Sequence, residues 1–178
     1  MGTTNGSLLE TLGALLDYPV VEPDDLLIAC LSDPALDPEA LANLERFAGA
    51  IVDLTVTDMQ EEYTATFDFD QECSLDVGWH LFGDTHERGA FMASLREDMI
   101  RTGVPESAEL PDHLTHVLAL LARDPDGAPA LAEAVAPGVD AVAHALVDRG
   151  SPYQYLLAAI SDELTALRAG KREEVAHT

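Results

Sequence analysis

The chain has 178 residues, enough for one domain, and 47% of them are hydrophobic, mostly Leu, Ala and Val with few aromatics. This composition favours packed helices over a β-sandwich. The 33 Asp and Glu residues outnumber nine Lys and Arg, giving a formal net charge of −24, which argues against nucleic acid and anionic membrane surfaces as partners. Because the acidic residues are spread along the whole chain, they indicate a halophilic cytoplasm or a positively charged partner.

Cysteine usage and hydropathy bear on the compartment. Cys30 and Cys73 are the only cysteines, too few for a disulfide framework, so a reducing compartment is expected. The N-terminus lacks the basic and apolar regions of a secretory signal, and the longest apolar runs are too short to span a bilayer. We therefore expect a cytoplasmic protein with no membrane insertion.

In the first half of the chain, apolar residues recur at helical spacing. The first predicted helix covers 7–17, and a short second one follows Pro23. The third begins at the pair Asp37-Pro38, a cap followed by proline in the first turn. Thr57 with Gln60 predicts the capping box of a fourth. Residues 68–83 are harder to assign, although their later apolar residues suit a helix.

The second half continues in the same way. A strong helix is predicted over 84–102, ending at Gly103, and Pro111 is expected to open the next. An Ala-rich helix is expected to break at Pro137-Gly138 and a further one to follow it. Ser151-Pro152 predicts the start of the last helix. The expected fold is all-α: one helical domain over 1–170 and a polar C-terminal tail over 171–178.

The run "FGDTHERGAFM" at 82–92 concentrates polar residues between two glycines. Asp84 with Glu87 resembles a capping box, which would make the run only a helix start. That interpretation leaves His86 and Arg88 unexplained. The run has neither the glycine spacing nor the lysine of a phosphate-binding loop, and no strand precedes it as a dinucleotide fingerprint requires.

The sequence gives little support for a metal site or a nucleophile. The available ligands do not have the spacing of known zinc motifs; they are Cys73, His80, Asp84, His86, His113 and His116. No Ser lies in a nucleophile elbow, and the acidic neighbours of Cys73 would raise the pKa of its thiol. We therefore expect no metal and no catalytic residues, with a small ligand-binding helical enzyme as an outside alternative.

A second run, "ELPDHL" at 109–114, follows the predicted 84–102 helix. Pro111 suits the first turn of a helix, and Asp112 suits its positive N-terminal end. His113 is not explained by either rule. On its own, this run reads as a helix start.

Both runs gain meaning from a family resemblance. The block "EEYTATFDFDQECSLDVGWHLFGDTHERGAFMASL" at 61–95 resembles the central signature of the NarJ branch of the TorD/DmsD-type chaperones, which assist maturation of molybdenum-cofactor oxidoreductases. "ELPDHL" is similar to a second family motif at the expected distance. "LLDYP" near the start and "SPYQYLL" near the end also fit. The residues Asp76, Val77 and Gly78 depart from the usual pattern, which bears on the identity of the oxidoreductase.

The resemblance implies a TorD/NarJ-like helical bundle without catalytic turnover. Such a protein binds the N-terminal segment of the catalytic, molybdopterin-binding subunit of nitrate reductase or a relative. It binds no cofactor permanently and meets the molybdopterin cofactor only transiently, through its client. A monomer or a swapped dimer is expected. The alternative is a permanent, non-catalytic regulatory subunit of the same oxidoreductase.

The same resemblance implies a set of peptide contacts. Aromatic side chains would line a groove between helices, and polar side chains from the two runs would contact the bound segment. The expected contact residues are Trp79, Phe82, Asp84, His86, Arg88, Gly89, Glu109, Pro111, Asp112 and His113.

Overall fold

The computed structural model describes residues 5–176, and the side chains of residues 7–169. This part of the chain is helical and contains no named strand, which confirms the predicted all-α class. The elements are α1 (Asn5–Leu15), α2 (Asp24–Leu31), α3 (Pro38–Ile51), α4 (Val56–Phe67), the 3₁₀ turn η1 (Gln71–Cys73), α5 (Val77–Phe82), α6 (His86–Thr102), α7 (Leu114–Arg123), α8 (Ala128–Arg149) and α9 (Tyr153–Ala176).

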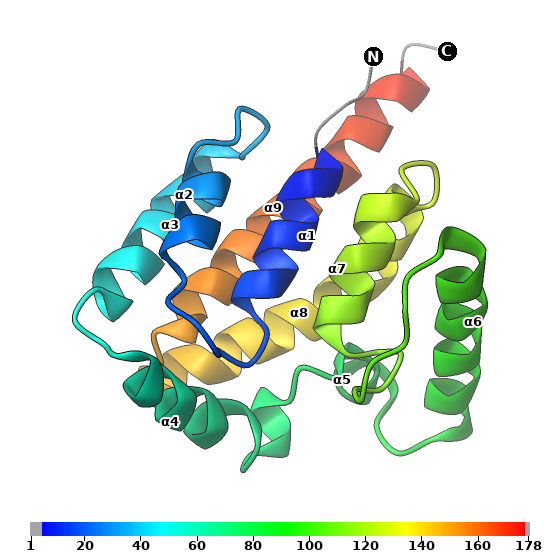
Figure 1. The fold of residues 1–178 in the computed structure, drawn as a ribbon. Helices are drawn as coiled ribbons and strands as arrows, with labels where there is room; N and C mark the ends of the chain where they lie inside the picture. The colour runs from blue at the N-terminus through cyan, green and yellow to red at the C-terminus, as the bar shows by residue number, and fades with distance from the viewer. Residues whose placement is uncertain (1–4, 177–178) are drawn as a thin grey trace.

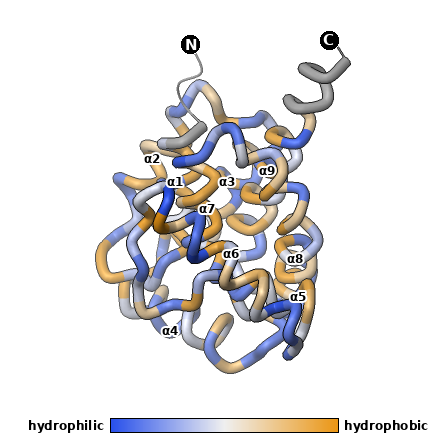
Figure 2. Tube along the Cα trace, turned by 90° about the vertical axis from the view of Figure 1, so that its right-hand side faces the viewer, coloured by the Kyte–Doolittle hydropathy of each residue, from blue (hydrophilic) through white to orange (hydrophobic). Residues whose placement is uncertain are grey.

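The two longest helices, α8 and α9, organise the bundle (Figure 1). Helix α9 packs against α8 and against α3, while α1 packs against α7 and α2. The buried faces are leucine-rich, as the apolar stripes predicted: Leu12 of α1, Leu16 directly after it and Leu118 of α7 are fully buried. Figure 2 shows hydrophobic and hydrophilic residues alternating along single helices, as expected for helices with one face in a shared core.

Helix α6 lies at the edge of the bundle, on the opposite side from α2 and α3 (Figure 1). It buries Leu95 and Met99, but Ile100 is 76% exposed. Glycines with positive φ flank this helix: Gly83 with φ 64° and Gly103 with φ 73°. Gly103 is the predicted stop, and its left-handed backbone explains why glycine is suited to it.

Two predicted caps are wrong by one or two residues. Thr55, not Thr57, caps α4, and its capping-box partner is Asp58 rather than Gln60. Thr85, not Asp84, caps α6 by accepting a hydrogen bond from the Arg88 amide. In both cases a threonine adjacent to the expected start competes for the same role, and sequence spacing alone does not choose between them.

Two predicted boundaries are also wrong. Pro111 does not open a helix, because α7 begins at Leu114 with His113 as its cap. Helix α8 is not broken at Pro137-Gly138 but runs through both residues. Pro137 faces solvent, whereas Gly138 is buried. The packing of this helix against α5 and α9 therefore outweighs the local cost of proline.

Helix α9 is longer than the sequence predicted. Helix α9 continues to Ala176, into the segment expected to be a tail, and residues 177–178 lie outside the described part.

Among the described residues, helix α8 is long and apolar enough to cross a membrane by length and composition. Its Val135, Val139 and Leu146 are buried inside the bundle, as in the core helix of a globular protein.

Candidate functional site

Arg88 joins the two sequence runs through buried ion pairs. Its Nε donates to Asp112 Oδ2 at 2.8 Å, and its Nη2 donates to Asp112 Oδ1 at 3.3 Å and to Asp76 Oδ2 at 3.0 Å. Asp112 has no exposed surface. The hydrogen bonds that Arg88 donates to Asp112 raise the pKa of Arg88, so this charge is permanent. We call Arg88, Asp76 and Asp112 the Arg88 clamp.

Backbone contacts reinforce the clamp. The Val77 amide donates to the Asp112 carbonyl at 2.9 Å, and the Leu114 amide donates to the Leu75 carbonyl at 2.8 Å. These bonds form an isolated antiparallel bridge between Asp76 and His113. The clamp thus fixes the end of the loop 103–113 against the start of α5.

Gly78 explains the unusual Asp-Val-Gly stretch noted in the sequence. A Cβ at position 78 would lie 2.3 Å from Asp112 Oδ2 and 3.1 Å from a Phe91 ring carbon. Only glycine lets the buried carboxylate come so close to α5. Asp76 supplies the clamp's second carboxylate, and Val77 donates the backbone hydrogen bond to Asp112. Asp76, Val77 and Gly78 therefore all contribute to the contact between the start of α5 and Asp112.

The predicted groove aromatics lie around this clamp rather than in a cleft. Trp79 is half-buried, and the Arg88 guanidinium carbon lies 5.8 Å from its ring centroid, a cation–π distance. Phe82, which is 38% exposed, packs on Phe91 with ring centroids 5.4 Å apart. Neither residue lines the two cavities described below.

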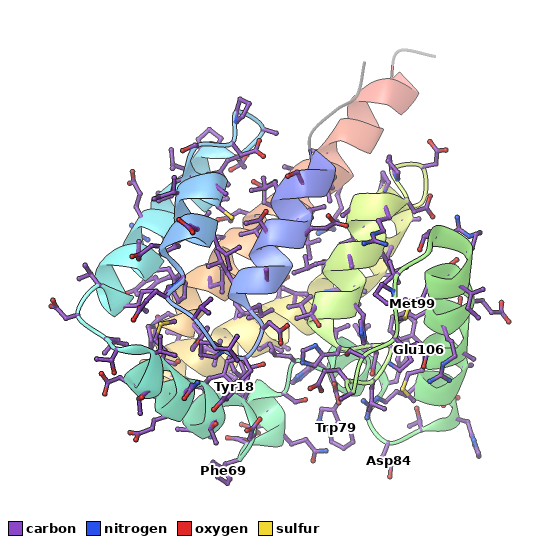
Figure 3. The ribbon with its side chains drawn as sticks, viewed as in Figure 1. Tyr18, Phe69, Trp79, Asp84, Met99 and Glu106 are labelled. Atoms are coloured by element: carbon purple, nitrogen blue, oxygen red, sulfur yellow. The ribbon has the colours of Figure 1, made fainter. Side chains whose placement is uncertain are left out.

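The remaining predicted contact residues divide into two groups. Asp84, His86 and Gly89 are exposed near the start of α6, and Figure 3 shows Asp84 at the outer end of that helix. Pro111 is buried beside the clamp. Glu109 and His113 point to a different place, where the structure has its cavities. The predicted residues therefore do not form one continuous contact surface.

The larger cavity, of about 450 Å³, lies between α1, α7 and the loop 103–113. We call it the groove. Small side chains line it, including Gly13 and Ala14 of α1, Ala108 of the loop and Ala119 of α7. Charged residues stand among them: Glu10, Asp17, Glu109 and Arg123. Small apolar side chains interspersed with charged ones suit an extended or helical peptide.

Hydrogen bonds fix the loop wall of this groove. His116 Nδ1 is 2.8 Å from the Leu110 carbonyl oxygen, and His116 Nε2 is 3.0 Å from Ser107 Oγ. Arg123 Nη1 donates to the Gly103 carbonyl at 2.6 Å. The loop is therefore held at both ends and in its middle, which preforms the groove.

A second cavity, of about 370 Å³, adjoins the groove, and we call it the acidic cavity. Asp17 and Glu109 line both cavities, so the two are neighbours. Tyr18 and Tyr63 contribute aromatic surface, with ring centroids 5.5 Å apart in an edge-to-face arrangement. Figure 3 shows Tyr18 close to α4, whose Tyr63 it contacts.

His113 is the buried polar residue of the acidic cavity. Its Nδ1 accepts a hydrogen bond from the Thr115 amide at 3.4 Å and lies 2.7 Å from Thr115 Oγ1. Burial lowers the pKa of His113 despite the opposing effect of Glu109. In this arrangement Nδ1 faces the first turn of α7, so His113 acts as its cap.

Sequence reasoning missed Asp17, Tyr18 and Tyr63 as site residues. Tyr63 appeared only as part of an apolar helical stripe, and that role is real because it is buried and packs on Phe67. The available signal for the other two was the "LLDYP" run at the end of the first helix, which fitted the family pattern. Asp17 and Tyr18 line the same cavity as Glu109 only because the fold places the end of α1 beside the loop 103–113.

The histidines of residues 7–169 do not gather into a metal site. Both ring nitrogens of His116 already have partners, and His80 Nε2 is 2.7 Å from the Ser74 carbonyl oxygen. Within the described part of the chain, no three His, Cys, Asp or Glu side chains lie close enough together to hold one ion. Burial raises the pKa of the Cys73 thiol, as its acidic neighbours had suggested, with Glu72 adding to the effect.

The fold is thus an all-helical bundle with a groove between α1, α7 and the loop 103–113 and an ion-pair clamp beside it. Comparison with known proteins identifies the family. Residues 32–159, more than half of the chain, match the family model described as nitrate reductase delta subunit. The chain belongs to this family, which confirms the NarJ-type resemblance.

A curated relative supports the same assignment. The chain is 31% identical over 127 residues to a protein of Escherichia coli (strain K12) described as probable nitrate reductase molybdenum cofactor assembly chaperone NarW. The aligned region covers 67% of this chain and 51% of the relative. The chain thus spans about half the length of the curated relative that it matches.

Proposed function

We propose that this chain is a cytoplasmic assembly chaperone for a molybdenum-cofactor oxidoreductase, nitrate reductase or a relative. It binds the N-terminal segment of the catalytic subunit and holds that subunit until the molybdopterin cofactor has been inserted. It meets the cofactor only through this client and performs no catalytic turnover. The family membership and the role described for the Escherichia coli relative support the class of function.

The observation that carries the peptide-binding part is the groove with the acidic cavity beside it. The groove lies along α1, α7 and the loop 103–113 and shares Asp17 and Glu109 with the acidic cavity; we call the two cavities together the hollow. Its small apolar floor accepts apolar anchors of a peptide, and its acidic rim favours a basic one. Glu109 and His113, from the predicted contact set, line this hollow.

The Arg88 clamp has a supporting role in this proposal. Asp112 is fully buried and Arg88 is engaged with two carboxylates, so neither side chain is free to bind a peptide in this conformation. We assign them to positioning the loop 103–113. Asp84, His86 and Gly89 remain candidates for a second contact of the client on the exposed start of α6.

The direct test is capture of the client from the native host. The tagged protein is recovered from cytoplasm at the host's working salt concentration, and bound proteins are identified by mass spectrometry. We expect the immature catalytic subunit of a molybdenum oxidoreductase, and we expect its loss when that subunit's N-terminal segment is deleted. Failure to recover any such subunit from cells that make the enzyme would refute the proposal.

The same preparation separates a chaperone from a permanent regulatory subunit. A chaperone is absent from the finished, cofactor-loaded enzyme and elutes alone as a monomer or a swapped dimer. Size-exclusion chromatography with light scattering gives the mass of the free protein. Stoichiometric presence of the chain in the active oxidoreductase would favour the permanent subunit instead.

A further inference from the structure

The loop 103–113, which forms one wall of the groove, is anchored at both ends by buried contacts. At the first end Val104 is buried, and its amide donates to the Met99 carbonyl at 3.0 Å. At the second end the Arg88 clamp holds Asp112, which has no exposed surface. We call the residues between these anchors, 105–110, the strap.

The strap itself has little to hold it in place. All of its residues are exposed, so it buries no side chain in the core. Among the described residues, 105–109 take part in no backbone–backbone hydrogen bond. A segment without buried apolar contacts or a backbone ladder has low local stability, and ordering it costs conformational entropy. Its position therefore depends on the few side chains that reach it.

His116 of α7 is a buried side chain that reaches the strap twice; it is 6% exposed. Its Nδ1 lies 2.8 Å from the Leu110 carbonyl oxygen, and its Nε2 lies 3.0 Å from Ser107 Oγ. A carbonyl oxygen only accepts, so Nδ1 carries the hydrogen, and in the neutral ring Nε2 accepts from the Ser107 hydroxyl. Ser107 Oγ accepts in turn from the Glu109 amide at 3.1 Å. One buried ring thus holds the middle and the end of the strap through connected hydrogen bonds.

Two further side chains approach the strap, both less firmly. Arg96 Nε donates to Glu106 Oε1 at 2.8 Å, but these side chains are 50% and 55% exposed, and such ion pairs contribute little. Figure 3 shows Glu106 between the loop and α6, where this exposed pair lies. His113 Nε2 is 4.0 Å from Glu109 Oε2, which is beyond hydrogen-bond distance. The buried hydrogen bonds of His116 therefore contribute most to the position of the strap.

We infer that His116 is the positioning residue of the groove: through Ser107 and Leu110 it keeps the strap where the groove accepts the client segment. This inference rests on the proposed function and names the residue that controls its binding site. Ala108 and Glu109 of the strap line the groove, so a displaced strap removes part of its wall. A wall fixed before binding spares the client the cost of ordering it, and a loose wall leaves only a fraction of molecules competent to bind.

Three variants separate His116 from the other contacts of the strap. H116F keeps a ring at the buried position but removes both hydrogen bonds to the strap. S107A removes one of these bonds from an exposed position and leaves α7 unchanged. The matched control is R96A, which removes the exposed ion pair of the same strap. Circular dichroism confirms that each variant is folded.

The first measurement requires no client. Nitrogen-15 relaxation gives backbone order parameters for the free protein, which report local motion rather than global stability. In the wild type and in R96A we expect the strap to be as ordered as the helices, at about 0.85, and in H116F to fall below about 0.6 while α7 and α8 stay unchanged. A strap that is flexible in the wild type, or equally ordered in H116F, would overturn the inference.

The second measurement is the affinity for a synthetic peptide with the sequence of the N-terminal segment of the captured catalytic subunit. Calorimetry is carried out in about 1 M KCl, where the Debye length is about 3 Å and general attraction to the acidic surface is screened. We expect H116F to weaken binding about tenfold or more and S107A about threefold. R96A should change the dissociation constant by less than about twofold.

The outcomes distinguish failure of the positioning role from failure of the proposed function. If the wild type does not bind the peptide, the proposed function fails, whereas the order parameters still show whether His116 holds the strap. If the wild type binds and folded H116F binds as tightly, or if R96A loses as much affinity, the positioning role of His116 is refuted. Should H116F fail to fold, S107A decides, and unchanged affinity in S107A would refute the inference.

Discussion

At the residue scale, the contrast between Arg88 and Arg96 separates a buried ion pair from an exposed one. Arg88→Ala leaves Asp112 charged and without exposed surface, so we expect the free energy of unfolding to fall by about 3–5 kcal/mol. Arg96→Ala removes an ion pair with Glu106 whose partners are 50% and 55% exposed, and should cost at most about 1 kcal/mol. Urea denaturation measures both; equal losses would contradict the clamp.

Gly78 and Gly89 form a second matched pair. Gly78→Ala places a Cβ against Asp112 and Phe91, so we expect a loss of about 1–3 kcal/mol from overpacking. At Gly89 the new Cβ meets nothing within 4 Å in an exposed turn of α6, so Gly89→Ala should gain about 0.5–1 kcal/mol from helix propensity. Thermal melts of the two variants should move in opposite directions. Stabilisation by Gly78→Ala would show that α5 and Asp112 are not in close contact.

The contacts between these residues cannot be predicted from one sequence. The runs around Arg88 and Asp112 stood out because their histidine and arginine had no role in a helix start. Their ion pair crosses 24 positions of the chain, and nothing local specifies it. Asp112 was expected to contact a peptide, whereas the fold buries it, because a carboxylate that meets a guanidinium in the core is stable there only as a pair.

At the element scale, α3 and α9 are joined by a buried carboxylate. Glu163 Oε1 accepts a hydrogen bond from the Asp37 amide at 2.7 Å, and the residue is 1% exposed. Burial raises the pKa of Glu163 to about 6 from the ordinary value of 4.5. The folded state therefore binds this proton more tightly than the unfolded state, and the protein loses stability as pH rises from about 4.5 to about 6.

Glu163→Gln should remove that pH dependence while keeping an acceptor for Asp37. Relative to the wild type, we expect the variant to gain about 2 kcal/mol in the free energy of unfolding between about pH 4 and pH 7. The control is Glu45→Gln at an exposed position of α3, the helix that Asp37 caps, which should show no such trend. Parallel pH profiles for Glu163→Gln and the wild type would contradict the assignment.

Helices were predictable to the extent that each carries its own apolar stripe. The stripe of α1 and the Asp37-Pro38 start of α3 were found because caps and periodicity are local. Helix α8 was expected to break because Pro137 is a strong local signal, but its buried face continues through Gly138. A Cβ at Gly138 would lie 2.9 Å from the Val77 carbonyl oxygen, so α8 packs closely on α5 at this point. This packing keeps the helix continuous where the local propensity of Pro137 predicted a break.

At the scale of the whole molecule, the net charge of −24 sets the dependence on salt. Because acidic groups outnumber basic ones, their mutual repulsion opposes the compact state, and salt screens it. We expect the melting temperature to rise when KCl is increased from about 0.1 M to about 1 M, as the Debye length falls from about 10 Å to about 3 Å. An unchanged or lower melting temperature would contradict the halophilic interpretation of the composition. Sorbitol at matched osmolality controls for effects unrelated to charge.

The overall architecture and the family were accessible from the sequence, but the hollow was not. The groove is built from α1 and, almost 90 residues further along the chain, from the loop 103–113 and α7, and its small lining residues belong to no motif. Glu109 and His113 were identified through the second run, whereas Asp17 and Tyr18 needed the fold to bring them there.

The central claim is that this hollow receives the N-terminal segment of the catalytic subunit. The most direct measurement is the affinity of that segment, as a peptide, for the wild type, for A108W and for A93W. Ala108 lines the groove from the loop, so a tryptophan there should fill the groove and weaken binding about tenfold or more; Ala93 is exposed on α6 and serves as the control. Loss of binding in A108W alone is the predicted result, and undiminished binding by A108W would contradict the claim.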